Sequence, residues 1–220
     1  MGEKYTIVSM HVGGPKQVVR NGEELYTSFL KAPTTKRIAL TETGLVGDGQ
    51  AVTEHHGGEE KAVCVYPYSH YHYWEKTLGK TMDYPSFGEN ITVKGLTEEN
   101  VYLGDIFQWG DAIVQVNQPR KPCNRISFVH QEKTLTKQVM QTGFTGFYMR
   151  VIEPGEVSAG DVLERVEQHH EQVSIALVNQ TLYFDRKNEA ALRSILKVDA
   201  IASTLQEQVE KRLKSVVDTI

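Results

Sequence analysis

The sequence predicts a mostly β protein, in which a barrel-like domain of short strands and a few short helices is followed by a small three-helix module. Two observations carry this prediction. Up to about residue 166, brief runs rich in β-branched and aromatic residues alternate with glycine-marked turns, a pattern typical of strands. Beyond residue 166 glycine is absent, and apolar residues recur with a helical period. We therefore expect two domains, at residues 1–166 and 167–220.

The expected strands are short and end at turn residues. The stretch Trp109-Gly110-Asp111-Ala112 is typical of a hairpin turn between two of them. A helix is expected at 69–78, because Tyr71, Trp74 and Leu78 then fall roughly on one face, and another at 133–142. The strands are expected at residues 6–10, 37–40, 62–66, 90–93, 106–109, 112–116, 147–152 and 162–166.

The residues after 171 fit three helices. Leu182 belongs to the apolar face of the first, Asn188 can cap the second, and Leu205 and Val209 lie one turn apart in the third. A module of about fifty residues buries little surface alone, so we expect it to pack on the barrel or on a second subunit, as in a homodimer. We expect it to be structural or an interaction surface rather than catalytic, so that truncation after about Val166 would leave ligand binding by the barrel largely intact but change the oligomeric state.

Composition limits the classes of function. The chain has 220 residues, with 24 Lys and Arg against 28 Asp and Glu, and the resulting net charge of -4 argues against a general nucleic-acid-binding protein. Apolar runs of signal-peptide or membrane-span length are not seen, so we expect a cytoplasmic protein with no membrane partner. The two cysteines, Cys64 and Cys123, lie in unlike contexts, which argues against a disulfide framework.

Cys123 is the first candidate for chemistry. It lies in the stretch NQPRKPCNRI (residues 117–126), where three cationic side chains favour the thiolate, the form that acts as nucleophile and soft-metal ligand. The two prolines restrict the loop and would present the sulfur rather than pack it. The alternative is an incidental loop cysteine beside solvated charges. Cys64, by contrast, lies inside an apolar strand and is interpreted as a small core residue.

A glycine pair precedes that apolar strand, in the order His55-His56-Gly57-Gly58. Paired glycines let successive backbone N–H groups form an anion-binding nest, to which Lys61 would add charge, so phosphate is a natural ligand. The two histidines could instead suggest zinc, but adjacent side chains of an extended strand point to opposite faces, and no further ligand pattern completes a site. A third interpretation is an ordinary turn with both histidines at the surface.

Lys31, Asp48, Asn90 and Arg150 each allow a plain interpretation as solvated charges or turn residues, but their order along the chain is informative. The ordered blocks are Ser28 with Lys31, Gly44-Leu45 with Gly47-Asp48, residues 56–63 (HGGEEKAV), 87–90 (FGEN), Gly104-Asp105, 118–123 (QPRKPC), 143–150 (GFTGFYMR), and Pro154-Gly155 with Gly160-Asp161. Together they resemble the MOSC family, named for the C-terminal domain of molybdenum cofactor sulfurase. The helical tail is similar to the three-helix extension of its stand-alone bacterial YiiM-like members.

The resemblance implies a β-barrel with a cleft for the molybdenum cofactor (molybdopterin), a pterin that bears a dithiolene and a phosphate. In that picture Cys123 ligates molybdenum or carries sulfur, and a thiolate suits such a thiophilic metal. Asp48 and Asn90 would orient basic groups through hydrogen bonds. The other residues that the resemblance places at the pocket are Lys31, His56, Gly57, Gly58, Lys61, Arg120 and Arg150.

The activity implied by the resemblance is the reduction of small N-hydroxylated compounds, such as hydroxylaminopurines. Electrons would come from an external reductase, because the sequence shows no flavin, haem or iron–sulfur motif. One alternative is a carrier of sulfur or molybdenum cofactor, with Cys123 as persulfide or docking site. Another is a hydrolase in which His56 or His130 serves as base for Cys123. The sulfurases carry a pyridoxal-phosphate-dependent desulfurase domain with no counterpart in this sequence, so pyridoxal phosphate binding is a family-level association that we do not expect here.

Overall fold

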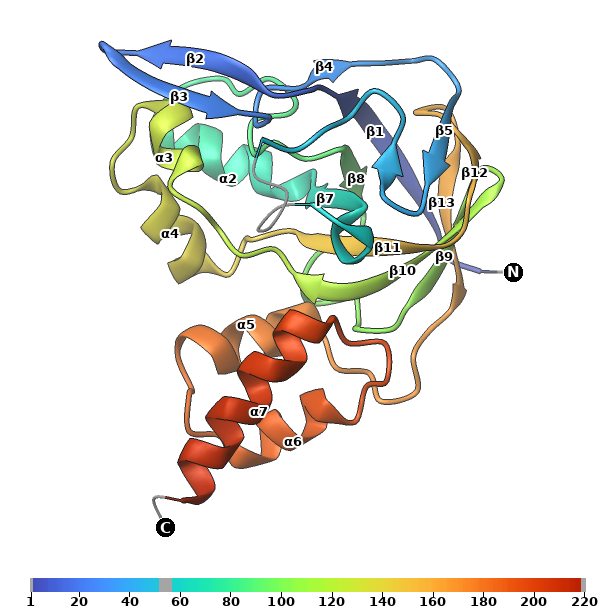
Figure 1. The fold of residues 1–220 in the computed structure, drawn as a ribbon, viewed down its shortest axis with the longest axis vertical. Helices are drawn as coiled ribbons and strands as arrows, with labels where there is room; N and C mark the ends of the chain where they lie inside the picture. The colour runs from blue at the N-terminus through green and yellow to red at the C-terminus, as the bar shows by residue number, and fades with distance from the viewer. Residues whose placement is uncertain (1, 52–56, 219–220) are drawn as a thin grey trace.

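The computed structural model describes residues 2–51 and 57–218. Within these residues seven strands close into a barrel (Figure 1). In order round the barrel they are β1 (Lys4–Val12), β13 (Val162–Glu167), β9 (Ile106–Trp109), β10 (Ala112–Pro119), β11 (Phe147–Glu153), β7 (Val63–Pro67) and β8 (Ile91–Lys94). Closure comes from β1, which pairs with β8 on one side and β13 on the other. Only the β7–β8 pair is parallel among these strands, and the predicted barrel-like fold class is confirmed.

Within the described residues, two smaller sheets accompany the barrel, and one further short strand pairs with β1. All eight expected strands are present, and the segment expected at 37–40 forms part of one of these sheets. The hairpin of β2 and β3 was not predicted from the sequence, because its residues are mostly polar and exposed. Its turn nevertheless carries the Asn21-Gly22 signal, with positive φ at both residues. The additional strands are β2 (Lys16–Arg20), β3 (Glu23–Thr27), β4 (Ala32–Pro33), β5 (Ile38–Thr41), β6 (Gly44–Leu45) and β12 (Gly155–Val157).

Short helices pack against the barrel near the β10–β11 connection (Figure 1). They are η1 (Glu59–Lys61), α2 (Ser69–Leu78), α3 (Arg125–His130) and α4 (Leu135–Thr142). The helix expected at 69–78 is found in place, and the one expected at 133–142 begins at Leu135. Trp74 of α2 belongs to a hydrophobic cluster with Phe87 and with Ile126 and Leu135 of the next two helices. This cluster fixes the segment that follows Cys123.

The three expected C-terminal helices are α5 (Ile175–Tyr183), α6 (Glu189–Leu196) and α7 (Ser203–Val217). Asn188 caps α6 as predicted, because its Oδ1 accepts a hydrogen bond from the backbone N–H of Ala191 at 3.0 Å. The module lies beside β10 (Figure 1), and its buried apolar residues belong to the same hydrophobic cluster as those of the barrel. None of the helices within the described residues has the length and apolar character needed to cross a membrane.

Candidate functional site

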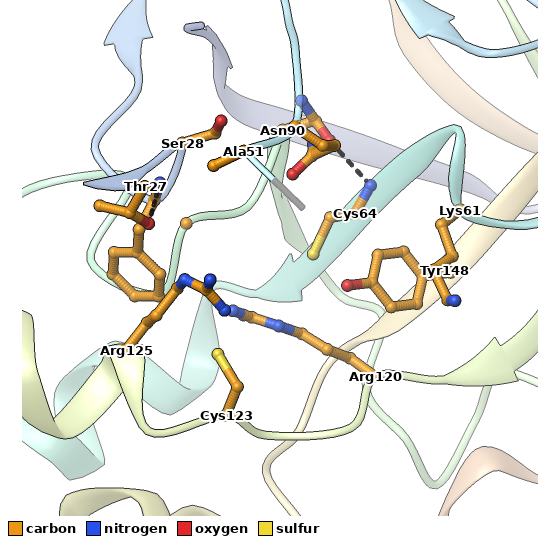
Figure 2. Close-up of a pocket in the computed structure, with 13 residues that line it drawn as sticks. Thr27, Ser28, Ala51, Lys61, Cys64, Asn90, Arg120, Cys123, Arg125 and Tyr148 are labelled. Carbon is orange, nitrogen blue, oxygen red and sulfur yellow. Dashed lines mark hydrogen bonds between the residues drawn. The ribbon is translucent and has the colours of Figure 1, made fainter. Parts of the chain in front are cut away.

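A pocket with about 520 Å³ of empty space opens between the end of β3, strand β7 and the loop that joins β10 to α3 (Figure 2). Four of the residues predicted for the site meet there, namely Lys61, Asn90, Arg120 and Cys123. The remaining lining residues are Thr27, Ser28, Phe29, Gln50, Ala51, Cys64, Gly88, Arg125 and Tyr148. Strands far apart in sequence therefore bring a thiol and several cationic side chains into one cavity.

Cys123 is half-buried, and its side chain points into this pocket (Figure 2). Its backbone carbonyl accepts hydrogen bonds from the Ile126 N–H and the Thr136 hydroxyl, both at 3.1 Å. These bonds come from α3 and α4, so two helices hold the cysteine loop in place. The sulfur is thus positioned by packed structure and remains reachable from the pocket.

Arg120 is the most unusual group in the pocket. It is only 6% exposed, and its guanidinium carbon lies 5.9 Å from the centre of the Phe29 ring. Its Nη1 is buried and finds no hydrogen-bond partner among the described residues. Burial opposes its charge, but interactions with Cys64, Tyr148 and Cys123 raise the pKa of Arg120 above its usual value. A buried cation with an unused donor favours an anionic ligand.

Ser28 supplies a second unused donor. Its hydroxyl is buried, lines the same pocket and has no partner among the residues that the structure describes. Lys61 and Arg125 add two further cationic side chains to the lining. The pocket therefore offers a partly exposed thiol, three cationic side chains and two unsatisfied donor groups, which together suit a polar anion that also carries a soft metal or sulfur.

Asp48 organises a layer behind the pocket. Its carboxylate accepts hydrogen bonds from the Lys31 ammonium, from the Gly13 N–H at 2.9 Å and from Asn90 Nδ2 at 3.0 Å. Asn90 in turn accepts the N–H of Cys64 at 3.0 Å. Lys31 is consequently engaged by Asp48 and is not among the lining residues, whereas Asn90 is held at the pocket wall.

Cys64 is buried, as the sequence indicates, and it also lines the pocket, which was not predicted. Successive side chains of a strand point to opposite faces, so Val63 and Val65 enter the barrel core while Cys64 lines the pocket (Figure 2). Burial is the main cause of the raised pKa of the Cys64 thiol. This group is therefore a protonated thiol facing the same cavity as Cys123.

Arg150 lies apart from the pocket lining. Its guanidinium donates two hydrogen bonds to Gln115 Oε1, at 3.0 and 2.6 Å. Tyr148, two residues earlier on the same face of β11, lines the pocket instead, and burial raises its pKa well above the usual value. Tyr148 was not predicted as a site residue from the sequence, although period-2 alternation along β11 links it to the predicted Arg150.

The glycine pair lies at the edge of the described structure. Gly58 has a φ of 91° and its carbonyl accepts the Lys61 N–H at 3.0 Å, which fixes the start of η1. Gly57 and Gly58 are not among the lining residues, and His56 lies outside the described residues. His130, the other base considered for a hydrolase, is hydrogen-bonded through Nε2 to the Ser86 carbonyl at 2.6 Å.

The fold and the site together describe the class of protein: a closed barrel that carries a thiol in a cation-lined pocket. A family model described as MOSC domain matches residues 52–164, and a second, described as YiiM-like, 3-alpha helix domain, matches residues 173–216. The chain belongs to the MOSC family, whose members are generally associated with the molybdenum cofactor. The combination of both regions is that of the YiiM-like members.

Individual relatives agree with this assignment. Protein YflK of Bacillus subtilis (strain 168) is 40% identical over 96% of this chain and 95% of its own length. The crystal structure of YiiM from Geobacillus stearothermophilus has a TM-score of 0.81 and 38% identity, and covers 95% of this chain and 99% of that one. A protein of Gibberella moniliformis (strain M3125 / FGSC 7600) named reductase is 29% identical over 73% of this chain, but over only 29% of its own length.

Proposed function

We propose that this protein binds the molybdenum cofactor and reduces small N-hydroxylated compounds, with Cys123 as the molybdenum ligand. The observation that carries the proposal is the convergence of the Cys123 thiol, the unpartnered Nη1 of Arg120 and the unpartnered hydroxyl of Ser28 in one pocket. Membership of the MOSC family supports the cofactor, and the name of the fungal relative favours a reductive activity.

The donor set fits the chemistry of this cofactor. A thiolate is a soft ligand and suits a thiophilic metal, while Arg120, Lys61 and Arg125 would hold the anionic phosphate and oxygen atoms. Ser28 would donate a further hydrogen bond. Asn90 would keep its orientation through Asp48, so the layer behind the pocket fixes the groups that touch the ligand.

When bound, the cofactor would supply the two-electron redox chemistry that removes oxygen from the substrate nitrogen. Reduction of a hydroxylamino group consumes two electrons and two protons and releases an amine and water. The electrons would come from an external cytoplasmic reductase. The chain's own residues would bind and orient the cofactor: the cationic side chains would hold the anion, and the buried Phe29 and Tyr148 complete the lining.

The test uses protein expressed in a host that makes the cofactor. We expect stoichiometric molybdenum by elemental analysis, and reduction of a hydroxylaminopurine with a chemical electron donor. The Cys123→Ala variant should lose at least about 100-fold in activity, because the metal loses its protein ligand. The exposed Lys133→Ala variant, remote from the pocket, serves as control. Activity that survives in Cys123→Ala at the control level would contradict the proposal.

The second candidate function is a carrier of sulfur or of the cofactor, and the same half-buried thiol in a cationic pocket favours it. Mass spectrometry of the native protein separates the two. A sulfur adduct on Cys123 without metal supports the carrier, whereas molybdenum together with turnover supports the enzyme.

A further inference from the structure

A larger groove, with about 1310 Å³ of empty space, lies next to the Cys123 pocket, between the barrel and the three-helix module. Its barrel side includes Gln118, Pro119 and Pro122. Its other side is formed by the module, with Tyr183 from α5 and Thr204 and Gln208 from α7. The module is therefore part of a cavity and does more than cover the barrel.

The groove adjoins the pocket. Lys61, Cys123 and Tyr148 line both of them. A molecule that lies in the groove can thus direct one end toward the Cys123 sulfur while the rest of it contacts the module. Cys123 stands where the two spaces meet, which is the position expected of a reacting centre served by a separate substrate-binding region.

The walls of the groove suit a flat ring system with polar edges. Pro119, Pro122, Leu182 and Leu205 give apolar surface, and half-buried Tyr183 adds an aromatic ring. Thr204 and Gln208 lie one helical turn apart, so both project on one side of α7. Their side chains make no hydrogen bond to any other residue that the structure describes, and they are free to bond a ligand.

The module wall is held in a fixed position relative to the pocket. The Glu60 carboxylate, next to Lys61, accepts hydrogen bonds from the Ser203 N–H at 2.7 Å and from the Ser203 hydroxyl at 2.8 Å. The Ala202 N–H donates to the Asn117 carbonyl at 3.0 Å. Farther along α7, Arg212 Nη1 donates to the carbonyl of Leu182 in α5 at 2.9 Å. Both helices of the wall are thereby fixed, which favours selective binding of one ligand shape.

We propose that the three-helix module forms one wall of the substrate-binding groove, where Tyr183, Thr204 and Gln208 select planar heteroaromatic compounds and direct their hydroxylamino group toward Cys123. This inference rests on the proposed function for its chemistry. It assigns to the module a specificity-determining role, where the sequence indicates a structural part or an interaction surface.

The test compares a bicyclic substrate with a minimal one. We expect Thr204→Val and Gln208→Ala each to raise the KM for a hydroxylaminopurine about tenfold, the loss of one ligand hydrogen bond, with little change in kcat. The KM for hydroxylamine, which is too small to span the groove, should rise much less. Molybdenum content should equal that of the wild type. Gln206→Ala, on the same helix but outside the groove, is the matched control.

A second measurement does not depend on turnover. Titration calorimetry with adenine, the amine that matches a hydroxylaminopurine, should show binding to the wild type and to Gln206→Ala, and weaker binding to Tyr183→Ala and Gln208→Ala. If wild-type protein reduces no N-hydroxylated compound but still binds adenine in this pattern, the proposed reaction is wrong and the groove assignment stands. Equal KM values for all variants, or adenine binding that is absent or insensitive to these substitutions, would overturn the groove assignment.

Discussion

Arg120 and Glu89 show how single buried charges prepare the pocket. Glu89 is fully buried, and its two oxygens are occupied by the Tyr71 hydroxyl, the Phe87 N–H at 3.1 Å and the Thr92 hydroxyl at 2.8 Å. Burial is the main cause of the raised pKa of Glu89. The Arg120 guanidinium keeps one buried donor, Nη1, without a partner among the described residues, and an anionic ligand would supply that partner.

His11 gives a prediction about pH. It is 1% exposed, and burial, together with the charge of Lys31, lowers its pKa from 6.5 to about 4. The folded state holds the ring neutral, whereas the unfolded chain accepts a proton below pH 6.5. The contribution of His11 to the free energy of unfolding is therefore complete above pH 6.5 and is lost as the pH falls toward 4. Over that window the free energy of unfolding should fall by about 3 kcal/mol more in the wild type than in His11→Gln.

Urea denaturation at several pH values between 7 and 4 measures this difference. The comparison concerns the slope with pH, so any constant destabilisation by the substitution cancels. The exposed His72→Gln variant should keep the slope of the wild type. If the free energy of unfolding depends on pH in the same way in the wild type and in His11→Gln, the His11 ring is not held neutral in the folded state.

At the scale of elements, α7 begins without a capping side chain of its own. Its N-cap residue is Ala202, and the Glu60 carboxylate takes that role from η1 by accepting two bonds from Ser203. Replacing Glu60 by Ala should lower the free energy of unfolding by about 1–2 kcal/mol and speed amide exchange in the first turn of α7. Hydrogen exchange measured by mass spectrometry checks this, with the neighbouring Glu59→Ala as control. Equal exchange in both variants would mean that the cap is not needed.

The order and type of most elements could be predicted because periodic apolar residues dominate them. The β2–β3 hairpin was missed since its strands are exposed and polar, and α3 since six residues after a proline-rich loop carry little periodic signal. At the site, Cys123 and Arg120 were found through local chemistry and family blocks. The place of Cys64 at the pocket was not predicted, because a run of apolar residues does not reveal which of them turn toward a cavity.

Lys31 shows a different limit of prediction from the sequence. Its family block predicts a charge at the pocket, but the buried pair with Asp48, which is 35 residues from Gly13 and 42 from Asn90, depends on tertiary contacts. The sequence predicts that Asp48 orients a basic group, but the folded structure is needed to show that Lys31 is paired with it behind the pocket wall. Contacts of this range leave no local pattern in the sequence.

At the scale of the whole molecule, barrel and module share one core. The N–H groups of Leu103 and Ile175 bond the carbonyls of Val173 and Val101, at 2.9 and 3.0 Å, so the chain before α5 runs beside the 98–103 segment. Val101 and Leu103 belong to the same hydrophobic cluster as the buried residues of all three C-terminal helices. This shared core argues against the sequence-based expectation that the barrel binds its ligand without the module.

Truncation after Glu167 tests whether the barrel depends on the core that it shares with the module. The fragment would expose Val101 and Leu103, which are fully buried in the whole chain, and would lose the backbone bonds to residues 173–176. Burial of each such side chain contributes about 1.5–3 kcal/mol, a large part of the stability of an ordinary domain, so we expect the fragment to aggregate or to unfold without a cooperative transition. Thermal denaturation and size-exclusion chromatography follow the outcome. A full-length control with exposed Phe184 and Val217 replaced by serine should stay soluble and cooperative. A monodisperse fragment that still binds molybdenum cofactor would show that the barrel is independent, because its core would then be complete without the helices.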